Sequence, residues 1–335
     1  MDSVSQALLG AATFAVVKDK HIGKKSLVIG AVAGTIPDLD VLLSPFFNEV
    51  AFITVHRSFS HSIFFAILGA FAFGYLAHRI SKYRYRYKDW ALAFFLAFFT
   101  HALLDWCTTY GTKILCPLDD YLFSLNNIHV IEPIYTSILL IGVLILAFRS
   151  MPVVSRSKVL IWTLSLSTLY LGWSGLSKSI ANQHFMTAVH AQNIPYEKVM
   201  ISPTPLNTFL WNGIIKTKDG YYLGSYSLFD SRNTIEFYFV ESRNDLLTEI
   251  EKFKKGRQYL AYTNGFPLVT VNDDMIKVYA IKFGPINYFG EPEFVYPLCI
   301  NLKDKTAENI EIEYSGKQRG PVKNYKNLFR RIKGL

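Results

Sequence analysis

Long uninterrupted hydrophobic runs dominate the first half of the chain. Two weaker runs, residues 4–17 and 27–43, come before four strong ones, at residues 63–77, 90–104, 133–148 and 159–173. Each strong run is close to the ~17–25 residues that a helix needs to cross ~30 Å of hydrocarbon. The pattern predicts an α-helical integral membrane domain of about six helices over residues 1–177. A buried helical core of a soluble protein is the alternative.

The second half has a different pattern, with shorter segments rich in aromatic and β-branched residues. They alternate partly between apolar and polar positions and are separated by Asp-Gly, Asn-Gly and Gly-Pro turns. This pattern is typical of antiparallel strands. We expect a soluble, mainly antiparallel β domain over residues 178–335, with one surface helix at 243–255. The expected strands are 220–229, 234–240, 257–263, 267–271 and 275–283.

Composition supports a membrane protein and excludes several other classes. Of 335 residues, 50% are hydrophobic and only 18% are charged, against about 25% charged in a typical soluble domain. The three cysteines, Cys107, Cys116 and Cys299, are too few for a disulfide framework or a cysteine-type zinc finger. The net charge of +9 is spread over both halves, so we expect no nucleic-acid partner.

Basic residues alternate strictly between the predicted loops. Loops 18–25, 79–88 and 149–158 hold twelve Lys and Arg residues, whereas loops 44–62 and 107–132 hold two. The positive-inside rule places the basic loops in the cytoplasm. We therefore predict a multi-pass protein of the bacterial inner (plasma) membrane with its β domain outside the cytoplasm. No basic segment precedes the first apolar run, so we expect no signal peptide.

Ionisable side chains collect at the predicted outer face of the membrane. Because the predicted membrane orientation rests on Lys and Arg residues alone, this clustering is an independent observation. Such side chains cost ~2.5–3.5 kcal/mol or more within a span, which makes them functional candidates. His101 and Asp105 are four residues apart on one helix and share a face. The seven candidates for metal ligation are Asp38, Asp40, His56, His61, His101, Asp105 and Glu132.

Mixed imidazole and carboxylate ligands favour a divalent cation, most of all Zn²⁺, with Mn²⁺ or Fe²⁺ as alternatives. Each motif alone is equally typical of a helix cap or a hydrogen bond on a helix face, so the prediction rests on their coincidence. Arg57 could bind phosphate or pair with Asp38 or Asp40. His129 is either a further ligand or a loop residue. The histidines expected only at the surface are His21, His78, His184 and His190.

At these residues the sequence resembles the YdjM-like family of membrane-bound metal-dependent hydrolases, over about residues 1–150. That family is distantly similar to the zinc-dependent phospholipase C and single-strand nuclease superfamily. The resemblance implies a metal site at Asp38, Asp40, His56, His61, His101 and Asp105, with Glu132 as a further member. The chain departs from the usual pattern at Gln6 (often His), Ser58 (usually Gly) and Cys116 (commonly aromatic). The motifs are Met1-Asp2-Ser3-x-x-Gln6-Ala7-Leu8-x-Gly10, Pro37-Asp38-x-Asp40, His56-Arg57-x-Phe59-Ser60-His61-Ser62, His101-x-x-x-Asp105-x-x-Thr108-x-x-Gly111 and Glu132-Pro133.

Three functions remain open from the sequence. The first is a hydrolase in which metal-activated water attacks a phosphodiester or phospholipid at the outer face, with Asp38, Arg57 and Asp105 as catalytic residues. The second is a non-catalytic envelope or stress-associated protein with a structural metal and a β domain that binds a partner. The third is a transporter or channel component whose buried acids form an ion path, although transport sites usually lie nearer the midplane.

Overall fold

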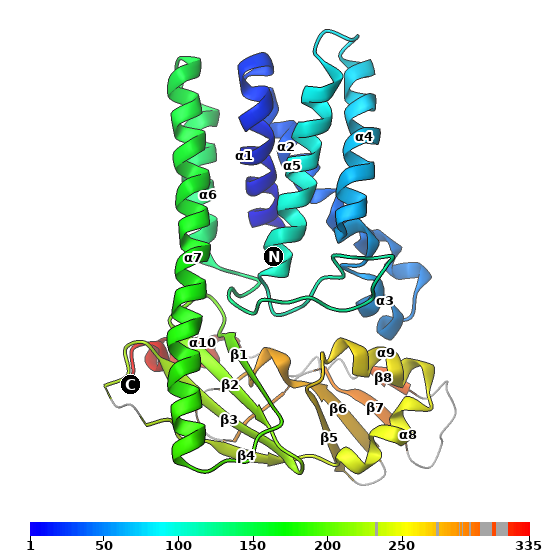
Figure 1. Cartoon of the computed structure of the whole chain (residues 1–335), viewed down its shortest axis with the longest axis vertical. Helices are drawn as coiled ribbons and strands as arrows, with labels where there is room; N and C mark the ends of the chain where they lie inside the picture. Colours follow the sequence, from blue (N-terminus) through cyan, green and yellow to red (C-terminus); the bar gives the residue numbers. More distant parts are fainter. Residues whose placement is uncertain are drawn as a thin grey trace. The chain divides into compact units, whose positions relative to one another are not determined.

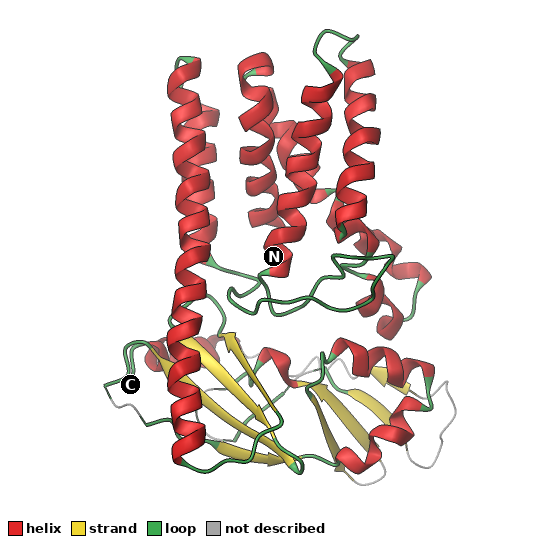
Figure 2. Cartoon of the chain, in the orientation of Figure 1, coloured by secondary structure: helices red, strands yellow, loops and turns green. Residues whose placement is uncertain are grey.

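The chain folds into a helical unit and a unit built on two β-sheets (Figures 1 and 2). The computed structural model describes residues 1–231, 234–272, 275–287, 289, 291–294, 296–301, 310–312 and 321–335. The helical unit comprises Met1–Leu43 and Val55–Ser174, and the sheet unit comprises Ser44–Thr54 and Gly175–Leu335. Within these residues, the helical first half and the antiparallel sheets of the second half agree with the sequence pattern.

Helices of the first half begin where the sequence supplies a cap. The Asp2 carboxylate accepts hydrogen bonds from the backbone N–H groups that open α1, and the Ser62 hydroxyl caps α4 in the same way. Pro133 occupies the first turn of α6, where no N–H is needed. The helices are α1 (Ser3–Ile22), α2 (Lys25–Thr35), η1 (Pro37–Phe46), α3 (Glu49–Val55), η2 (Phe59–His61), α4 (Ile63–Ile80), α5 (Tyr87–Trp106), α6 (Pro133–Phe148) and α7 (Val153–Ala191).

Helices α1 and α2 pack with their backbones almost in contact. A Cβ atom added to Gly10 would lie 2.5 Å from the Gly30 carbonyl oxygen, and one added to Gly34 would lie 2.4 Å from the Gln6 carbonyl oxygen. Only glycine allows such an approach, as at small-residue interfaces between membrane helices. This packing brings Gln6 and Gly34 together beside the C-terminal end of α5, where His101 lies.

Two helices, α4 and α7, are long and apolar enough to cross a membrane. The pair α2 and η1, bent by 41°, would count as a third span. Helix α6 is apolar but only 16 residues long. The described residues thus contain two or three candidate spans, and the predicted number of six is not confirmed. Charged and polar residues lower the hydropathy of the others, because α1 contains Lys18, Asp19 and Lys20 and α5 contains Asp89, His101 and Asp105.

The sheet unit contains two four-stranded sheets in which every strand pairs with its neighbour in antiparallel register. The first has the order β1-β2-β3-β4 and the second β5-β6-β7-β8. The last part of α7 covers the first sheet, where Phe185 packs with Trp211 and Tyr226. The strands are β1 (Lys198–Pro203), β2 (Leu210–Lys216), β3 (Gly220–Ser227), β4 (Tyr238–Glu241), β5 (Pro267–Asn272), β6 (Met275–Ala280), β7 (Leu298–Asn301) and β8 (Ile310–Ile312).

The expectation of a strand at 257–263 is wrong, because this segment belongs to helix α9 (Lys254–Tyr262). Gly256 and Tyr259 are three residues apart and are both buried, which is the spacing of a helix face and not of a strand. The expected helix over 243–255 is divided into η3 (Asn244–Leu246), α8 (Leu247–Glu251) and the start of α9, since Phe253 has extended backbone angles. The other elements of this unit are η4 (Ile281–Phe283) and α10 (Pro321–Ile332).

Candidate metal centre

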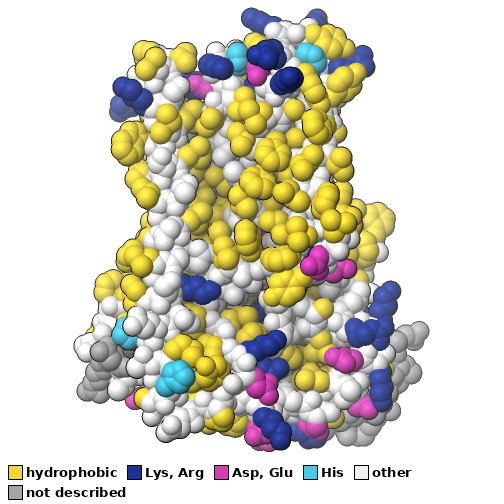
Figure 3. Space-filling model, in the orientation of Figure 1, with side chains coloured by type: hydrophobic (Ala, Val, Ile, Leu, Met, Phe, Trp, Pro, Cys, Tyr) yellow, Lys and Arg dark blue, Asp and Glu magenta, His cyan; other side chains and the backbone are white. Residues whose placement is uncertain are grey.

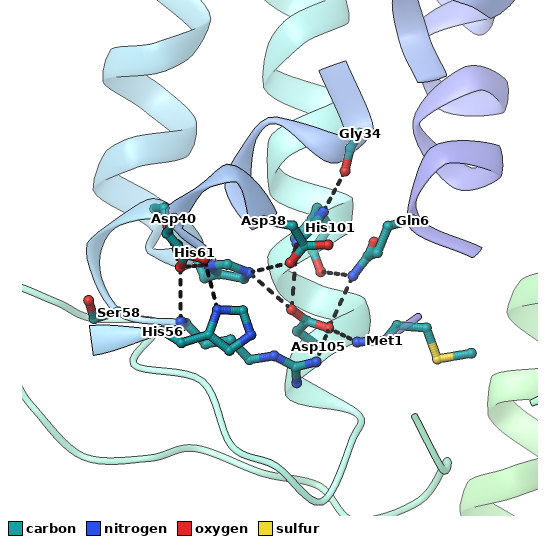
Figure 4. Close-up of polar contacts among 12 residues, drawn as sticks. Met1, Gln6, Gly34, Asp38, Asp40, His56, Ser58, His61, His101 and Asp105 are labelled. Atoms are coloured by element: carbon teal, nitrogen blue, oxygen red, sulfur yellow. Dashed lines mark hydrogen bonds and ion pairs between the residues drawn. The ribbon is translucent and has the colours of Figure 1, made fainter. Parts of the chain in front are cut away.

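Four of the predicted ligands converge at one end of the helical unit (Figure 4). Asp38 comes from η1, His61 from η2, and His101 and Asp105 from the last turns of α5. One ligand atom from each lies within 4.8 Å of all the others. His61 Nε2 is 3.2 Å from Asp38 Oδ1 and 3.3 Å from Asp105 Oδ2, and His101 Nε2 is 3.5 Å from the same two oxygens. We call these four residues the His–Asp group.

The His101 ring is oriented by the backbone of α2. Its Nδ1 lies 2.7 Å from the Gly34 carbonyl oxygen, and because a carbonyl only accepts, Nδ1 must donate. In the neutral ring, Nε2 then keeps its lone pair. His101 is buried, and Nε2 makes no hydrogen bond among the described residues. A buried nitrogen lone pair that lacks a donor and faces two carboxylates is typical of a metal ligand.

His61 is oriented through Ser60 and Asp40. The Ser60 hydroxyl donates to Asp40 Oδ2 over 2.9 Å and lies 2.9 Å from His61 Nδ1. Because the hydroxyl has one hydrogen, its oxygen accepts from His61 Nδ1–H. The Nε2 lone pair of His61 therefore points into the His–Asp group, like that of His101. A carboxylate behind a ligating imidazole is a common outer-shell arrangement at zinc sites.

Asp105 has one oxygen held by nitrogen donors and one left free. Oδ1 accepts from Gln6 Nε2 at 3.0 Å, lies 3.3 Å from Arg57 Nη2, and also contacts the terminal amine of Met1. Oδ2 is inaccessible to water and makes no hydrogen bond among the described residues, although it faces both imidazoles. The donors thus fix the carboxylate and leave Oδ2 as the atom that could bind a metal ion.

The geometry and chemistry of the group fit a first-row divalent ion. Ligands at about 2.0–2.2 Å in a tetrahedron are about 3.3–3.6 Å apart, and the four distances between imidazole nitrogens and carboxylate oxygens are 3.2, 3.3, 3.5 and 3.5 Å. Two nitrogen ligands disfavour Ca²⁺ and Mg²⁺, which select oxygen. The His–Asp group could therefore hold one metal ion of the zinc type.

Asp40 and His56, also predicted as ligands, lie beside the group as partners of one another. His56 Nδ1 is 2.8 Å from Asp40 Oδ1, while Asp40 Oδ2 also accepts from the Arg57 backbone N–H at 3.1 Å. The arrangement makes Asp40 a hydrogen-bond acceptor shared by several residues of the segment from His56 to His61.

Arg57 is buried next to Asp105. Its Nη1 donates to the Thr108 hydroxyl at 2.9 Å, its guanidinium lies 4.7 Å from the centre of the Tyr110 ring, and its Nε makes no hydrogen bond among the described residues. The backbone at Arg57 has a φ of +61°, which is costly for a residue other than glycine. In this conformation the guanidinium of Arg57 lies next to the Asp105 carboxylate.

Glu132 lies outside the His–Asp group. Its side chain is fully buried at the start of α6 and accepts a hydrogen bond from the Tyr170 hydroxyl at 2.8 Å. Burial raises the pKa of Glu132 to about 7, against the smaller opposing effect of Tyr170. His129 is not in the group either. Its Nδ1 accepts from the Ile131 N–H, and burial lowers the pKa of His129 to about 4.

Sequence reasoning missed three groups that shape the site. These groups are the Gln6 amide, which the sequence marks only as a departure from the family pattern, the Gly34 carbonyl and the Ser60 hydroxyl. The spacing Gly30-x3-Gly34 is typical of close helix packing, so it is the sequence signal that could have pointed to Gly34. Ser60 carried no signal of its own, because one serine between two histidines is common in loops.

Comparison with known proteins identifies a family for the N-terminal part of the chain. The family model described as YdjM inner membrane protein matches residues 1–181, which include every residue of the His–Asp group. No curated protein and no solved structure matches the chain.

Proposed function

The chain belongs to the YdjM inner membrane protein family, and from this membership and the geometry of the His–Asp group we propose that it is a membrane-bound metal-dependent hydrolase. Its proposed substrate is a phosphodiester or phospholipid at the outer face of the inner membrane. The observation that carries the proposal is the convergence of His61 Nε2, His101 Nε2, Asp38 Oδ1 and Asp105 Oδ2 at metal-ligand spacing.

A bound divalent ion would supply a water of lowered pKa as nucleophile and a positive charge for the phosphate oxygens. The residues of the chain have separate roles around it. Asp38 is the only member of the group that is not buried, so we assign it contact with the incoming water and the acceptance of its proton. Asp105 holds the ion through Oδ2, and Arg57 places a cation beside Asp105 that can stabilise an anionic phosphate.

The distribution of charge supports the proposed membrane orientation. Lys and Arg gather at one end of the helical unit (Figure 3), where loops 18–25, 79–88 and 149–158 connect the helices. The His–Asp group lies at the opposite end of α1 and α5, next to Gln6 and Trp106. The positive-inside rule then favours the outer face for the group.

Metal content of the detergent-purified protein tests the proposal. We expect about one equivalent of zinc, manganese or iron by elemental mass spectrometry. His101→Ala and Asp105→Ala should lose it, and His190→Ala, at an exposed position on α7, should keep it. Loaded wild type should then hydrolyse a chromogenic phosphodiester or phospholipid vesicles, and His101→Ala should not.

Two outcomes would count against this function. A folded wild type that takes up no metal after reloading would refute the metal site itself. Metal that raises the unfolding temperature without any hydrolysis would favour the alternative, a non-catalytic envelope protein in which the ion is structural and the β domain binds a partner.

A further inference from the structure

Exposed apolar side chains are neighbours in the sequence of the residues that form the His–Asp group on η1 and η2. On η1, residues next to the two aspartates have large exposed fractions: Leu39 50%, Val41 49% and Leu42 66%, with Leu43 at 45%. Phe59 on η2 is 45% exposed, one residue before Ser60. We call these five residues the apolar rim. Asp38 and Asp40 of the same helix instead direct their carboxylates inward, to His61, His101 and His56.

Four of the five rim residues lie on η1, the helix that carries the one member of the group that is not buried. His61, His101 and Asp105 are buried, whereas the Asp38 side chain is 20% exposed. Asp38 is followed directly by Leu39 in η1, so a molecule that approaches Asp38 along this helix passes apolar side chains. A polar, water-filled entrance would not be lined in this way, because each exposed apolar Å² costs about 25 cal/mol in water.

The rim continues the apolar face of a candidate span. Val28 and Val32 on α2 are 66% and 59% exposed, and the pair of α2 and η1 qualifies as one bent span. On the flank of the helical unit that Figure 3 shows, hydrophobic side chains cover much of the surface between the helix ends. A surface continuous with the lipid-facing side of a membrane helix is most simply covered by lipid as well.

We propose that η1 is immersed in the bilayer and that the apolar rim contacts the acyl chains of a membrane lipid, which reaches Asp38 laterally from the membrane. The substrate is then a lipid phosphodiester whose head group enters the His–Asp group while its tails remain against Leu39, Leu42 and Phe59. The substrate half of this inference rests on the proposed hydrolase function, whereas the position of η1 does not.

Photo-crosslinking in native membranes tests the position of η1. With p-benzoylphenylalanine in place of Leu42, we expect covalent lipid adducts of the intact chain by mass spectrometry. The same replacement at Phe229, which is 57% exposed in the sheet unit, is the matched control and should give none. Lipid adducts at Leu42 no more frequent than at Phe229 would overturn the inference.

Substrate access is tested with metal-loaded protein in nanodiscs. We compare a bilayer phospholipid with the water-soluble glycerophosphodiester that carries the same head group. Leu42→Asp should lower the rate on the bilayer lipid by at least about tenfold, because a charge at this depth repels acyl chains. Leu42→Asn is a milder second variant, and both variants should keep the metal and the wild-type unfolding temperature.

The outcomes separate the two proposals. Equal turnover of the soluble diester and the bilayer lipid by wild type would overturn lateral entry and leave the hydrolase function intact. No turnover of either substrate by metal-loaded wild type would instead refute the hydrolase function and the substrate half of this inference, and the crosslinking result would still decide the position of η1.

Discussion

Two clusters of buried charge lie on the same helix of the helical unit, and they are built in opposite ways. Asp19 of α1 pairs with Arg156 of α7, while Gln6 of α1 contacts Asp105 in the His–Asp group. Thirteen residues separate Asp19 from Gln6, which is about 20 Å along a helix. The protein therefore buries charged side chains near both ends of α1.

The Asp19–Arg156 pair satisfies its charges within the protein. Arg156 Nε donates to Asp19 Oδ2 at 2.7 Å, Nη2 donates to Oδ1 at 2.5 Å, and Nη1 donates to the Leu146 carbonyl at 2.7 Å. Each charged oxygen thus meets a donor, and one negative charge meets one positive charge. This is the pattern of a buried structural ion pair that fixes α1, α6 and α7 together.

In the His–Asp group, two atoms lack hydrogen-bond partners on the side where the four residues meet. His101 Nε2 and Asp105 Oδ2 are buried and make no hydrogen bond among the described residues, while Ser60, Gly34 and Gln6 satisfy the outer atoms of the same group. Partners on the outside and none on the inside are what a ligand site requires. The orientation of unpartnered atoms, and not buried charge itself, therefore distinguishes a candidate binding site from a structural ion pair.

The largest effect should come from breaking the structural pair. Arg156→Ala leaves Asp19 buried without a cation, so we expect a loss of about 3–5 kcal/mol in the free energy of unfolding, measured in detergent micelles. The metal content should not change. Arg243→Ala removes an exposed pair with Asp245 and should leave the free energy of unfolding nearly unchanged, because water screens exposed charges.

A double variant sharpens this prediction. Asp19→Leu combined with Arg156→Met replaces both charges by apolar side chains, and it should recover most of the lost stability because no charge is left unpaired. Metal loss in Arg156→Ala while the protein remains folded would contradict the comparison, because it would mean that the two clusters are one functional system.

A smaller effect should come from the donors behind the metal ligands. Gln6→Leu removes the donor to Asp105 Oδ1 and should weaken zinc binding about 10–100-fold, the usual effect of losing an outer-shell partner. Thr13→Val, a buried position on the same helix whose hydroxyl bonds only backbone carbonyls of α1, should leave the affinity unchanged. Competition with a fluorescent chelator measures both. Equal affinities in the two variants would show that Gln6 does not position Asp105.

Residue type and helical spacing were sufficient to predict much of the site. His101 and Asp105, four residues apart, do share a helix face, and Asp38 and His61 do join them. The spacing does not predict the direction in which each side chain points. Asp40 faces His56 and Ser60, and Glu132 faces Tyr170, because rotamers and backbone turns in η1 and η2 depend on packing that a linear pattern does not record.

The fold was predictable where the hydrophobic period is clear and not elsewhere. Segments 220–229 and 267–271 were recognised as strands, and β3 and β5 lie there. Residues 257–263 were misread because Tyr259 and Tyr262 have high strand propensity, whereas the packing of Tyr259 in the core beneath α9 selects the helix. The prediction of six spans is not confirmed, because the helices with buried polar residues are less apolar than a lipid-exposed span.

Glu132 is a further buried ionisable residue, and its surroundings resemble neither the Asp19–Arg156 pair nor the His–Asp group. One oxygen accepts from Tyr170, the other makes no hydrogen bond among the described residues, and no Lys or Arg pairs with it there.

With its pKa raised by burial to about 7, Glu132 binds a proton in the folded state between about pH 4.5 and 7 that it releases on unfolding. Wild-type stability should therefore fall as the pH rises through this window, by up to about 1.4 kcal/mol per pH unit. Glu132→Gln should remove that fall and keep the metal, while Asp120→Asn, at an exposed position, should change neither. A Glu132→Gln variant that loses metal would move Glu132 into the His–Asp group, and an unchanged pH dependence would show that its carboxyl group is ionised in the folded protein.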